Sequence, residues 1–456
     1  MPVKPERAGG FNDYGPRAMS ARHILERRIR EVYETFGFVP LETPMIEFME
    51  VLAGEEGSDM RIFGADSGAS GERRDLGMRF DHTVPLARYV SAQLKDLELP
   101  WRRYTFGPVF RGETTGAGRY HQFYQFDADI VGVKSLMADA EVIWLMTEAM
   151  KRLTTHSFKV RWSSRKIING LAETLGLTQD GRRLGLFRSI DKLDKIGWKG
   201  VRAELVRAPR NEFDEDAVAL NDDQAQVVEN FLQLTNEGTD SLSALTHLEE
   251  LIGQSKEGQS GIADLREIAR LLDTLGADSN CHQIDLSIAR GLGYYDGAVF
   301  ETVIEGAESF GSVYSGGRYN GLVSRFTGMP LPAIGASIGF DRLYAVLEHL
   351  KDLPNARPTP LKALIMDFGD EGSADQLLKL LSMLRSAGIS SEVYCGSERS
   401  FKAQMNRALK MEIPLLIIPG ERELQEGKVA VKNLNARTQV EVMITDLVDH
   451  LNQIED

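Results

Sequence analysis

The sequence lacks most of the features that mark secreted, membrane-spanning or nucleic-acid-coating proteins. Only two of its 456 residues are cysteines, Cys281 and Cys395, and their wide separation argues against a disulfide framework or a zinc site. No run of about 18 apolar residues occurs and no apolar leader stands at the N-terminus, so we expect a soluble, cytoplasmic protein without a membrane span. The formal net charge is −14. A uniformly basic coat for nucleic acid is therefore excluded, whereas a local basic patch is not.

The order of sequence patterns predicts several structural regions. Residues 101–131 read as a β-hairpin, residues 160–278 are charged and largely helical in pattern, and strand-like alternation returns at residue 282. The proline-containing segment "KDLPNARPTP" then precedes a regular alternation of strands and helices from residue 361 onward. This order predicts a mixed α/β protein with a separate C-terminal domain.

Residues 119–130, "RYHQFYQFDADI", predict a strand with two different faces. With a period of two, one face is mostly apolar and the other carries Arg119, His121, Phe123, Gln125, Asp127 and Asp129. The preceding strand, "WRRYTFGPVFR", adds Arg103, Thr105 and Arg111. One interpretation is an amphipathic hairpin with a solvated face, which is common in antiparallel sheets. We favour the floor of a ligand pocket, with arginine for phosphate, an aromatic plane for a base, and carboxylates for a small polar substrate.

Three glycine-rich segments each contain one arginine. They are "IARGLGYYDG" with Arg290, Tyr294 and Tyr295, "SGGRYNG" with Arg318 and Tyr319, and "IGASIGFDRL" with Arg342. Core packing is the more common fate of a tyrosine considered alone. Together, however, the segments favour clamping of phosphate and carboxylate groups, because glycine lets a backbone lie close to a ligand.

These motifs resemble those of the class II histidyl-tRNA synthetase family along the whole chain. "GFNDYGP" resembles the family's N-terminal signature, "TPMIEF" its dimer-forming first motif, and "RFDHTVPLARY" its amino-acid-binding segment. "FRGETTGAGRYHQFYQFDADIVG" and "IGASIGFDRL" resemble the second and third class motifs. "ARGLGYYDGAVFE" and "SGGRYNGL" resemble the two histidine-specific motifs, which are the most specific part of the match.

The resemblance implies a fold and an activity. The fold would be α/β, with a class II antiparallel sheet flanked by helices. The catalytic core would comprise residues 1–159 and 279–350, and a mostly helical insertion at 160–278 would separate its two parts. A linker at 351–360 would connect the core to an α/β anticodon-binding domain at 361–456. The implied activity is ATP-dependent activation of L-histidine to histidyl-adenylate and transfer of the histidyl group to the 3′ end of tRNA(His). ATP would carry Mg²⁺ without a dedicated metal site in the protein, and residues 18–46 would form a homodimer.

The resemblance also assigns site residues by their position in the motifs. Arg290 and Arg111 would be catalytic, with Arg290 bridging the substrate carboxylate and the α-phosphate. The histidine-binding residues would be Asp81, Thr83, Arg111, Gln125, Asp129, Arg290, Tyr294, Tyr295 and Tyr319. The ATP-binding residues would be Arg111, Glu113, Arg119, Phe123 and Arg342. Departures from the family pattern occur at Gly293, Asp296 and Asp341, where we expect adjusted packing, at His82, and in the "ETTGAG" loop, which lacks the basic character common in the family.

Two other functions are compatible with parts of this pattern. A synthetase-like regulatory subunit of histidine biosynthesis would bind ligand without catalysis, but such paralogues usually lack the anticodon domain and several pocket residues. A class II synthetase for threonine, proline or glycine would share the anticodon domain, but "ARGLGYYDG" argues against it.

The segment "RSFKAQMNRALK" predicts a basic helix in the C-terminal domain. At 100° per residue, Arg399, Lys402, Arg407 and Lys410 would lie within about 140° of arc. A charged helix face is usually no more than a solvated surface. Because the acidic residues of this domain lie mainly elsewhere, we predict instead that these four side chains bind tRNA.

Overall fold

The computed structural model describes residues 3–53, 62–66, 75–210, 214, 217–234, 241–288, 295–369 and 373–454. The chain divides into two compact units, one of residues 1–12 and 26–353 and the other of residues 13–25 and 354–456. Within the described part of the chain, no helix combines the length and the apolar character needed to cross a membrane.

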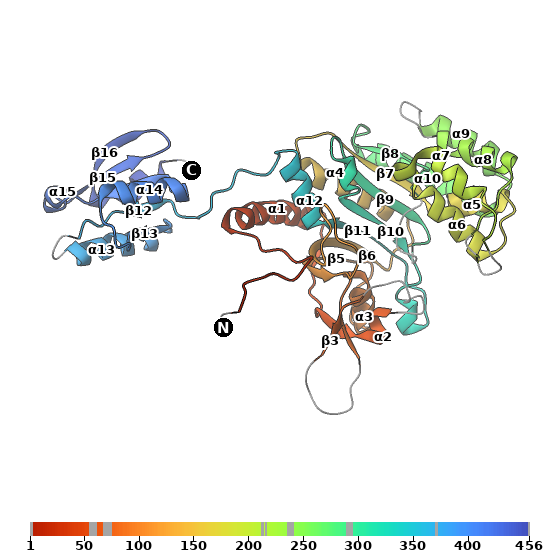
Figure 1. The fold of residues 1–456 in the computed structure, drawn as a ribbon, viewed down its shortest axis with the longest axis horizontal. Helices are drawn as coiled ribbons and strands as arrows, with labels where there is room; N and C mark the ends of the chain where they lie inside the picture. Colours follow the sequence, from red (N-terminus) through yellow and green to blue (C-terminus); the bar gives the residue numbers. More distant parts are fainter. Residues whose placement is uncertain are drawn as a thin grey trace. The chain divides into compact units, whose positions relative to one another are not determined.

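An eight-stranded sheet forms the centre of the first unit (Figure 1). Its strands, in spatial order, are β1 (Val39–Pro40), β5 (Trp101–Phe110), β6 (Gln122–Val131), β11 (Ala333–Gly339), β10 (Tyr314–Tyr319), β9 (Ala298–Ile304), β7 (Phe158–Ser164) and β8 (His282–Ile284). All neighbours are antiparallel except the pairs at the two edges, β1 with β5 and β7 with β8. The predicted fold class, a mixed α/β protein around an antiparallel sheet, is confirmed.

The β5–β6 hairpin has the two different faces that its period of two predicts. On the apolar face, the Phe126 ring lies 5.0 Å from Tyr33 of α1 (Pro16–Thr35) and 5.1 Å from Phe106. Helix α12 (Phe340–His349) packs against β6, and the centre of the Phe340 ring lies 5.1 Å from that of Phe106 on β5. The polar face is buried over its second half, where Gln125, Asp127 and Asp129 are 8%, 3% and 3% exposed. Arg119, in contrast, is exposed, and His121 and Phe123 are partly exposed. The interpretation of this face as solvated is therefore wrong for its three buried residues.

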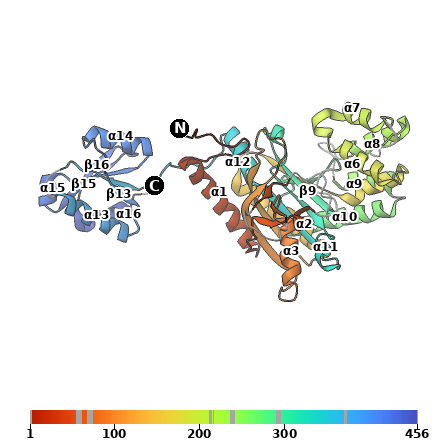
Figure 2. The same cartoon turned by 60° about the horizontal axis from the view of Figure 1, so that its bottom comes forward.

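Most of residues 160–278 are helical, as the sequence pattern indicated. The helices are α5 (Arg165–Thr174), α6 (Asp180–Ile190), α7 (Leu193–Leu205), α8 (Asp222–Gln233), α9 (Ser241–Ile252) and α10 (Lys256–Leu275). Figure 1 shows them grouped beyond the β7–β8 edge of the sheet, and Figure 2 shows the same group from a second direction. Helix α10 begins where the Ser255 hydroxyl accepts a hydrogen bond from Gly258 N, and it ends at Gly276 in the left-handed conformation. Strand β7 crosses the expected start of this region at residue 160 and belongs to the central sheet.

Shorter elements complete the first unit. Strands β2 (Ile46–Phe48), β4 (Leu76–Met78) and β3 (Gly64–Ala65) form a small antiparallel sheet. The remaining helices are α2 (Met49–Ala53), α3 (Thr83–Gln93), α4 (Met137–Leu153), which packs against β7 and β11, and α11 (Ser324–Thr327).

The second unit contains a five-stranded mixed sheet. Its order is β13 (Ser391–Val393), β12 (Ala363–Ile365), β14 (Leu415–Ile418), β15 (Lys428–Asn433) and β16 (Thr438–Met443). Strand β12 is parallel to both of its neighbours, whereas β15 and β16 form the closing antiparallel hairpin. The helices are α13 (Ser373–Ser386), α14 (Phe401–Met411), α15 (Glu421–Gln425) and α16 (Leu447–Asn452). The strand and helix alternation predicted for this region is confirmed.

Candidate active site

A cavity of about 430 Å³ lies on the polar face of the central sheet in the first unit. It brings together nine side chains that the sequence predicted for one site. They are Asp81, Thr83, Arg111, Glu113, Arg119, Phe123, Gln125, Tyr295 and Arg342. These residues come from the start of α3, the β5–β6 hairpin, the segment before β9 and the start of α12. The sheet therefore assembles in one place residues that are widely separated in sequence.

The floor of the cavity follows from the strand register. Asp127 of β6 pairs with Thr105 of β5 on one side and with Ser337 of β11 on the other. The same row continues through Ser315 to Glu301 and then to Arg161. Because side chains alternate between faces along every strand, paired positions share a face, and a continuous polar row results. Asp127, Ser337, Ser315 and Glu301 all line the cavity.

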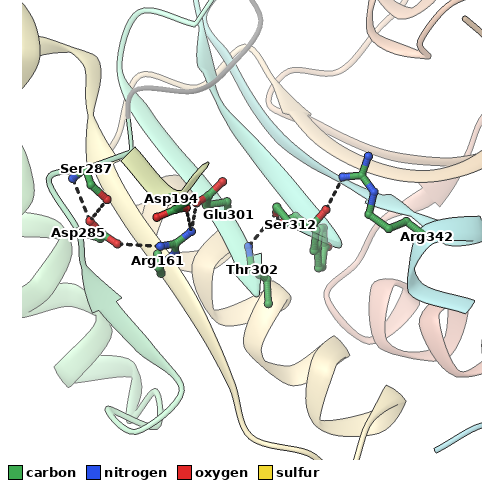
Figure 3. Close-up of polar contacts among 9 residues, drawn as sticks. Arg161, Asp194, Asp285, Ser287, Glu301, Thr302, Ser312 and Arg342 are labelled. Atoms are coloured by element: carbon green, nitrogen blue, oxygen red, sulfur yellow. Dashed lines mark hydrogen bonds and ion pairs between the residues drawn. The ribbon is translucent and has the colours of Figure 1, made fainter. Parts of the chain in front are cut away.

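One part of the cavity presents held guanidinium groups and an aromatic ring. Arg111 Nε donates a hydrogen bond to the Phe80 carbonyl at 3.0 Å, and its Cζ lies 5.2 Å from the centre of the Phe123 ring. Arg342 Nη1 donates to the Ser312 carbonyl at 2.7 Å (Figure 3). An arginine carries five N–H donors in a planar fork, which matches the geometry of phosphate oxygens. This combination suits phosphate groups beside a planar base.

Another group of lining residues presents hydrogen-bond acceptors. Asp81 Oδ1 accepts from Val84 N at 3.0 Å, which fixes this carboxylate at the first turn of α3. Gln125 Nε2 donates to Ser337 Oγ at 2.8 Å, which turns the amide oxygen of Gln125 away from that contact. Among the described residues, Gln125 Oε1 and Asp127 Oδ1 are buried without a hydrogen-bond partner. Buried acceptors that lack a partner are costly, so a ligand with N–H groups is the natural complement.

The environment of Asp127 changes its protonation. Burial raises the pKa of the Asp127 carboxyl to about 7; Asp129 and Asp81 add to the rise, whereas Arg103 and the Ser337 hydroxyl oppose it. A strongly shifted carboxyl in a cavity is typical of functional sites.

Asp129 and Tyr319 were predicted to bind histidine, but they are not among the described residues that line the cavity. The Tyr319 hydroxyl donates to Asp129 Oδ1 at 2.7 Å, and Asp129 Oδ2 lies 2.7 Å from Arg103 Nη2. All three side chains are buried. Gly335 is needed at this point, because a Cβ there would overlap the Asp129 carboxylate.

Two arginines that the sequence suggested for ligand clamping have structural partners instead. Arg103 is fully buried and pairs with Asp129. Arg318 Nε donates to Asp139 Oδ1 at 3.0 Å, and its Nη1 donates to the Val133 carbonyl at 2.7 Å. The hypothesis that each of the three glycine-rich segments delivers a ligand-binding arginine is therefore wrong for Arg318. Its glycines make room for neighbours, since a Cβ at Gly317 would lie 2.9 Å from the Tyr295 ring.

Arg290 and Tyr294 lie outside the described residues, so their predicted roles stay predictions. The residues that flank this segment in the described chain, Ile288 and Tyr295, both line the cavity.

The departures from the family pattern that the structure describes have specific partners. Asp341 Oδ2 accepts from Tyr124 N at 2.5 Å, and the Asp296 carboxylate accepts from Asn320 N and Nδ2 at 3.1 and 2.8 Å. His82 is 1% exposed, with Nε2 3.2 Å from the Gly107 carbonyl oxygen. Burial and then the charges of Arg79 and Arg103 lower the pKa of His82 well below its usual value. The ring is therefore neutral and structural.

Sequence reasoning missed several lining residues, namely Asp191, Lys195, Glu301, Ser315 and Ser337. Glu301 had a detectable signal, because a single acid within the apolar strand "AVFETVI" calls for a buried partner. That partner is Arg161, which also approaches Asp285 at 3.3 Å and Asp194 at 3.5 Å (Figure 3). The others lie on positions whose surroundings depend on long-range pairing.

The predicted tRNA-binding residues of the second unit fall into two classes. Arg399 precedes α14 rather than lying on it, and its Nη1 is 3.6 Å from Asp367 Oδ2. Arg407 donates to Glu392 Oε1 from Nε and Nη2 at 3.0 and 2.8 Å. Lys402 and Lys410 lie exposed on α14, and neither forms an ion pair with any other described residue. The two lysines are therefore the cations most available to a partner.

The sequence and the fold both match known proteins. The family model for histidyl-tRNA synthetase matches residues 10–343, and the model for an anticodon-binding domain matches residues 362–454. The chain is 38% identical to a histidine–tRNA ligase of Paracoccus denitrificans, covering 94% of this chain and 90% of the relative. It is 37% identical to the enzyme of the same name from Wolinella succinogenes, covering 95% of this chain and 94% of the relative. The crystal structure of histidyl-tRNA synthetase from Nostoc sp. superposes with a TM-score of 0.85 at 31% identity, covering 99% of this chain and all of that chain.

Proposed function

The chain belongs to the histidyl-tRNA synthetase family, and from this premise we propose which of its own residues perform each step. The reaction is ATP-dependent activation of L-histidine to histidyl-adenylate, followed by transfer of the histidyl group to the 3′ end of tRNA(His). The observation that carries the assignment of residues is the single cavity in which guanidinium groups, an aromatic ring and buried acceptors meet.

The guanidinium groups and the ring form the proposed ATP site. Phe123 would stack on the adenine, while Arg111, Arg119 and Arg342 would neutralise the phosphates and Glu113 would contact the adenine side. The Arg111 and Arg342 contacts to backbone carbonyls support this role, because they fix the direction of each guanidinium before the substrate binds. Mg²⁺ would enter with ATP and be held mainly by phosphate oxygens.

The acceptor groups form the proposed histidine site. Asp81, Thr83 and Gln125 line the cavity and would bind the amino group of the substrate, and Tyr295 would cover its ring. Tyr319 and Asp129 lie behind the residues that line the cavity, and they would support the histidine site from there. The hydrogen bond between them fixes the tyrosine hydroxyl. Tyr294 and Arg290 complete the proposed set from the segment between Ile288 and Tyr295.

The chemistry requires positioned charge rather than a general base. The attacking group is the histidine carboxylate, which is already ionised, and the bond that forms joins its oxygen to the α-phosphorus of ATP as pyrophosphate leaves. The barrier comes from the approach of two anions and from charge that builds on the phosphate, so cations supply most of the help. Arg111 and Arg290 are the proposed catalytic cations. In the transfer step, the substrate phosphate would accept the proton of the attacking tRNA hydroxyl.

The remaining proposals concern organisation. We assign the catalytic core to residues 1–159 and 279–350, the helical insertion to 160–278, the linker to 351–360 and anticodon binding to residues 361–456. We also propose a homodimer built on residues 18–46 and a cytoplasmic location. Exposed apolar side chains in that segment, with Ile46 47% and Met45 43% exposed, support the dimer.

ATP–pyrophosphate exchange with each amino acid in turn tests the function. Exchange that depends on histidine alone is the expected result. Exchange with threonine, proline or glycine would overturn the substrate assignment. Absence of exchange with every amino acid would favour a regulatory, ligand-binding role instead.

A further inference from the structure

We propose that Asp127 is a further histidine-binding residue, whose Oδ1 accepts a hydrogen bond from the α-ammonium group of the substrate. The proposal rests on the proposed function, because it names one more residue of the same histidine site. The strand periodicity placed Asp127 on the polar face, but neither it nor the family motifs assigned Asp127 to the α-ammonium group.

The position of Asp127 is the first argument. Its side chain is 3% exposed and lines the cavity between Gln125 and the deeper Asp129 on the same face of β6. Asp129 Oδ1 accepts a hydrogen bond from Tyr319, and Asp129 Oδ2 forms an ion pair with Arg103 Nη2 at 2.7 Å, although without hydrogen-bond geometry. Asp127 Oδ1, in contrast, has neither a hydrogen-bond partner nor an ion-pair partner among the described residues. A buried carboxylate oxygen in this state costs free energy until a donor arrives.

The number and charge of the neighbouring acceptors identify the donor. Gln125 Oε1 is also buried without a partner in the described part of the chain, and Asp81 supplies a second carboxylate to the same cavity. An ammonium group has three N–H donors, no acceptor and a full positive charge. A neutral imidazole has one donor and one acceptor, so it would satisfy only part of this set. Two carboxylates and an amide oxygen therefore match the α-ammonium group better than the ring.

The electrostatic surroundings agree with a cationic ligand. In the absence of ligand, burial and the neighbouring Asp129 and Asp81 hold the pKa of Asp127 near 7. Of the cations that face it, Arg103 pairs with Asp129, and Arg79 donates from Nη1 to the Thr43 carbonyl at 2.7 Å. The buried phenols of Tyr33 and Tyr314 lie on the opposite, apolar face of the sheet with Phe126, and they supply no positive charge. An ammonium ion beside Oδ1 would supply it and favour the carboxylate form.

Two histidine analogues separate the ammonium from the rest of the ligand. Histidinol keeps the ammonium and the ring, whereas 3-(imidazol-4-yl)propionic acid keeps the ring and lacks the ammonium. Asp127→Asn should weaken histidinol binding and raise the KM for histidine about 10- to 100-fold, the range for a hydrogen bond to a charged group. Binding of the deamino analogue should change less than twofold. Asp352→Asn serves as the control, because Asp352 binds Thr154 and Thr155 outside the cavity.

The wild-type protein provides a second readout. The ratio of the affinities for the two analogues is first corrected for the ring titration of each free compound, because the ammonium group of histidinol lowers the pKa of its ring. The corrected ratio should fall as the pH decreases from 8 to 6, because protonation removes the charge of Asp127, and it should be flat in Asp127→Asn. A pH-independent ratio in the wild type, or equal weakening of both analogues in the variant, would overturn the proposal. If the wild type catalysed no histidine-dependent ATP–pyrophosphate exchange, the proposed function itself would be overturned instead.

Discussion

Asp129 Oδ2 lies 2.7 Å from Arg103 Nη2, and this fully buried ion pair stands directly beneath the proposed histidine site. The two residues occupy paired positions of β6 and β5, and Tyr319 donates to the other oxygen of Asp129. The neighbouring residue on the same face of β6, Asp127, stands opposite Thr105 and Ser337 in the strand register. Two aspartates separated by a single residue therefore have different surroundings: Asp129 is held by partners within the protein, whereas Asp127 lines the cavity.

Arg290 is expected to act mainly in the chemical step. Arg290→Ala should lower the turnover number of histidine-dependent ATP–pyrophosphate exchange by at least ~100-fold, the scale for loss of one charge clamp in a transition state. The KM for histidine should change less, because other residues hold the amino group. Steady-state exchange kinetics measure both quantities. A variant with near-normal turnover would remove Arg290 from the catalytic set.

The free energy of unfolding should depend on pH through Asp127. The pKa of this carboxyl is about 7 in the folded protein and lower in the unfolded chain. Its protonated form is therefore favoured by folding, and the associated stability is present below the unfolded pKa and lost as the pH rises through 7. In ligand-free protein, Asp127→Asn should be more stable relative to wild type at pH 8 than at pH 5. Urea unfolding at both pH values measures the difference, and a difference independent of pH would refute the prediction.

The buried pair of Arg318 and Asp139 should matter for stability and not for ligand binding. Arg318 is 7% and Asp139 0% exposed. Asp139→Ala leaves a buried guanidinium without its counterion and should lower the free energy of unfolding by about 3–5 kcal/mol. The double variant Asp139→Leu/Arg318→Met should lose less, because it removes both charges. Urea denaturation compares the two. Greater loss in the double variant would contradict this account.

Lys402 and Lys410 should contribute to binding of tRNA. Reversing Arg407 would also break its contact with Glu392, so the lysines give the cleaner test. Lys402→Glu/Lys410→Glu should weaken tRNA charging and reduce its salt dependence, because fewer counterions are released on binding. Histidine-dependent exchange without tRNA should be nearly unchanged.

A control with the same change of charge is available in the same unit. Lys379→Glu alters an exposed residue of α13 and is compared with each single α14 variant, Lys402→Glu or Lys410→Glu. The prediction fails if this control weakens charging as much as the single α14 variants do, or if the double α14 variant loses exchange as well.

The segment around β2 should mediate self-association. Val39, Ile46 and Phe48 are 46%, 47% and 38% exposed, which leaves apolar surface for an isologous contact. Ile46→Asp should shift the protein from dimer to monomer in sedimentation velocity. Leu378→Asp, which changes an exposed leucine of α13, should not. A wild-type protein that sediments as a fully active monomer would refute the dimer.

The sequence alone determined the local structure and the composition of the site. Period-two alternation gave the β5–β6 hairpin and placed Gln125, Asp127 and Asp129 on one face, because alternation is a property of the strand itself. The glycine-rich motifs likewise placed Tyr295 and Arg342 at the cavity, where the structure has them. Such a motif is a local pattern of residue types within a short segment, so it can be recognised in the sequence without knowledge of long-range contacts.

Only the tertiary structure decided which polar residues have partners within the protein and which line the cavity. That decision depends on register between distant strands: Asp129 stands opposite Arg103, whereas Asp127 stands opposite Thr105 and Ser337. It also depends on packing between separate elements, since Arg318 finds Asp139 on α4 rather than a substrate. In the sequence, a charged residue that pairs within the protein looks the same as one that binds a ligand. Its partner is set by contacts between residues far apart in the chain, and these exist only after the sheet has formed.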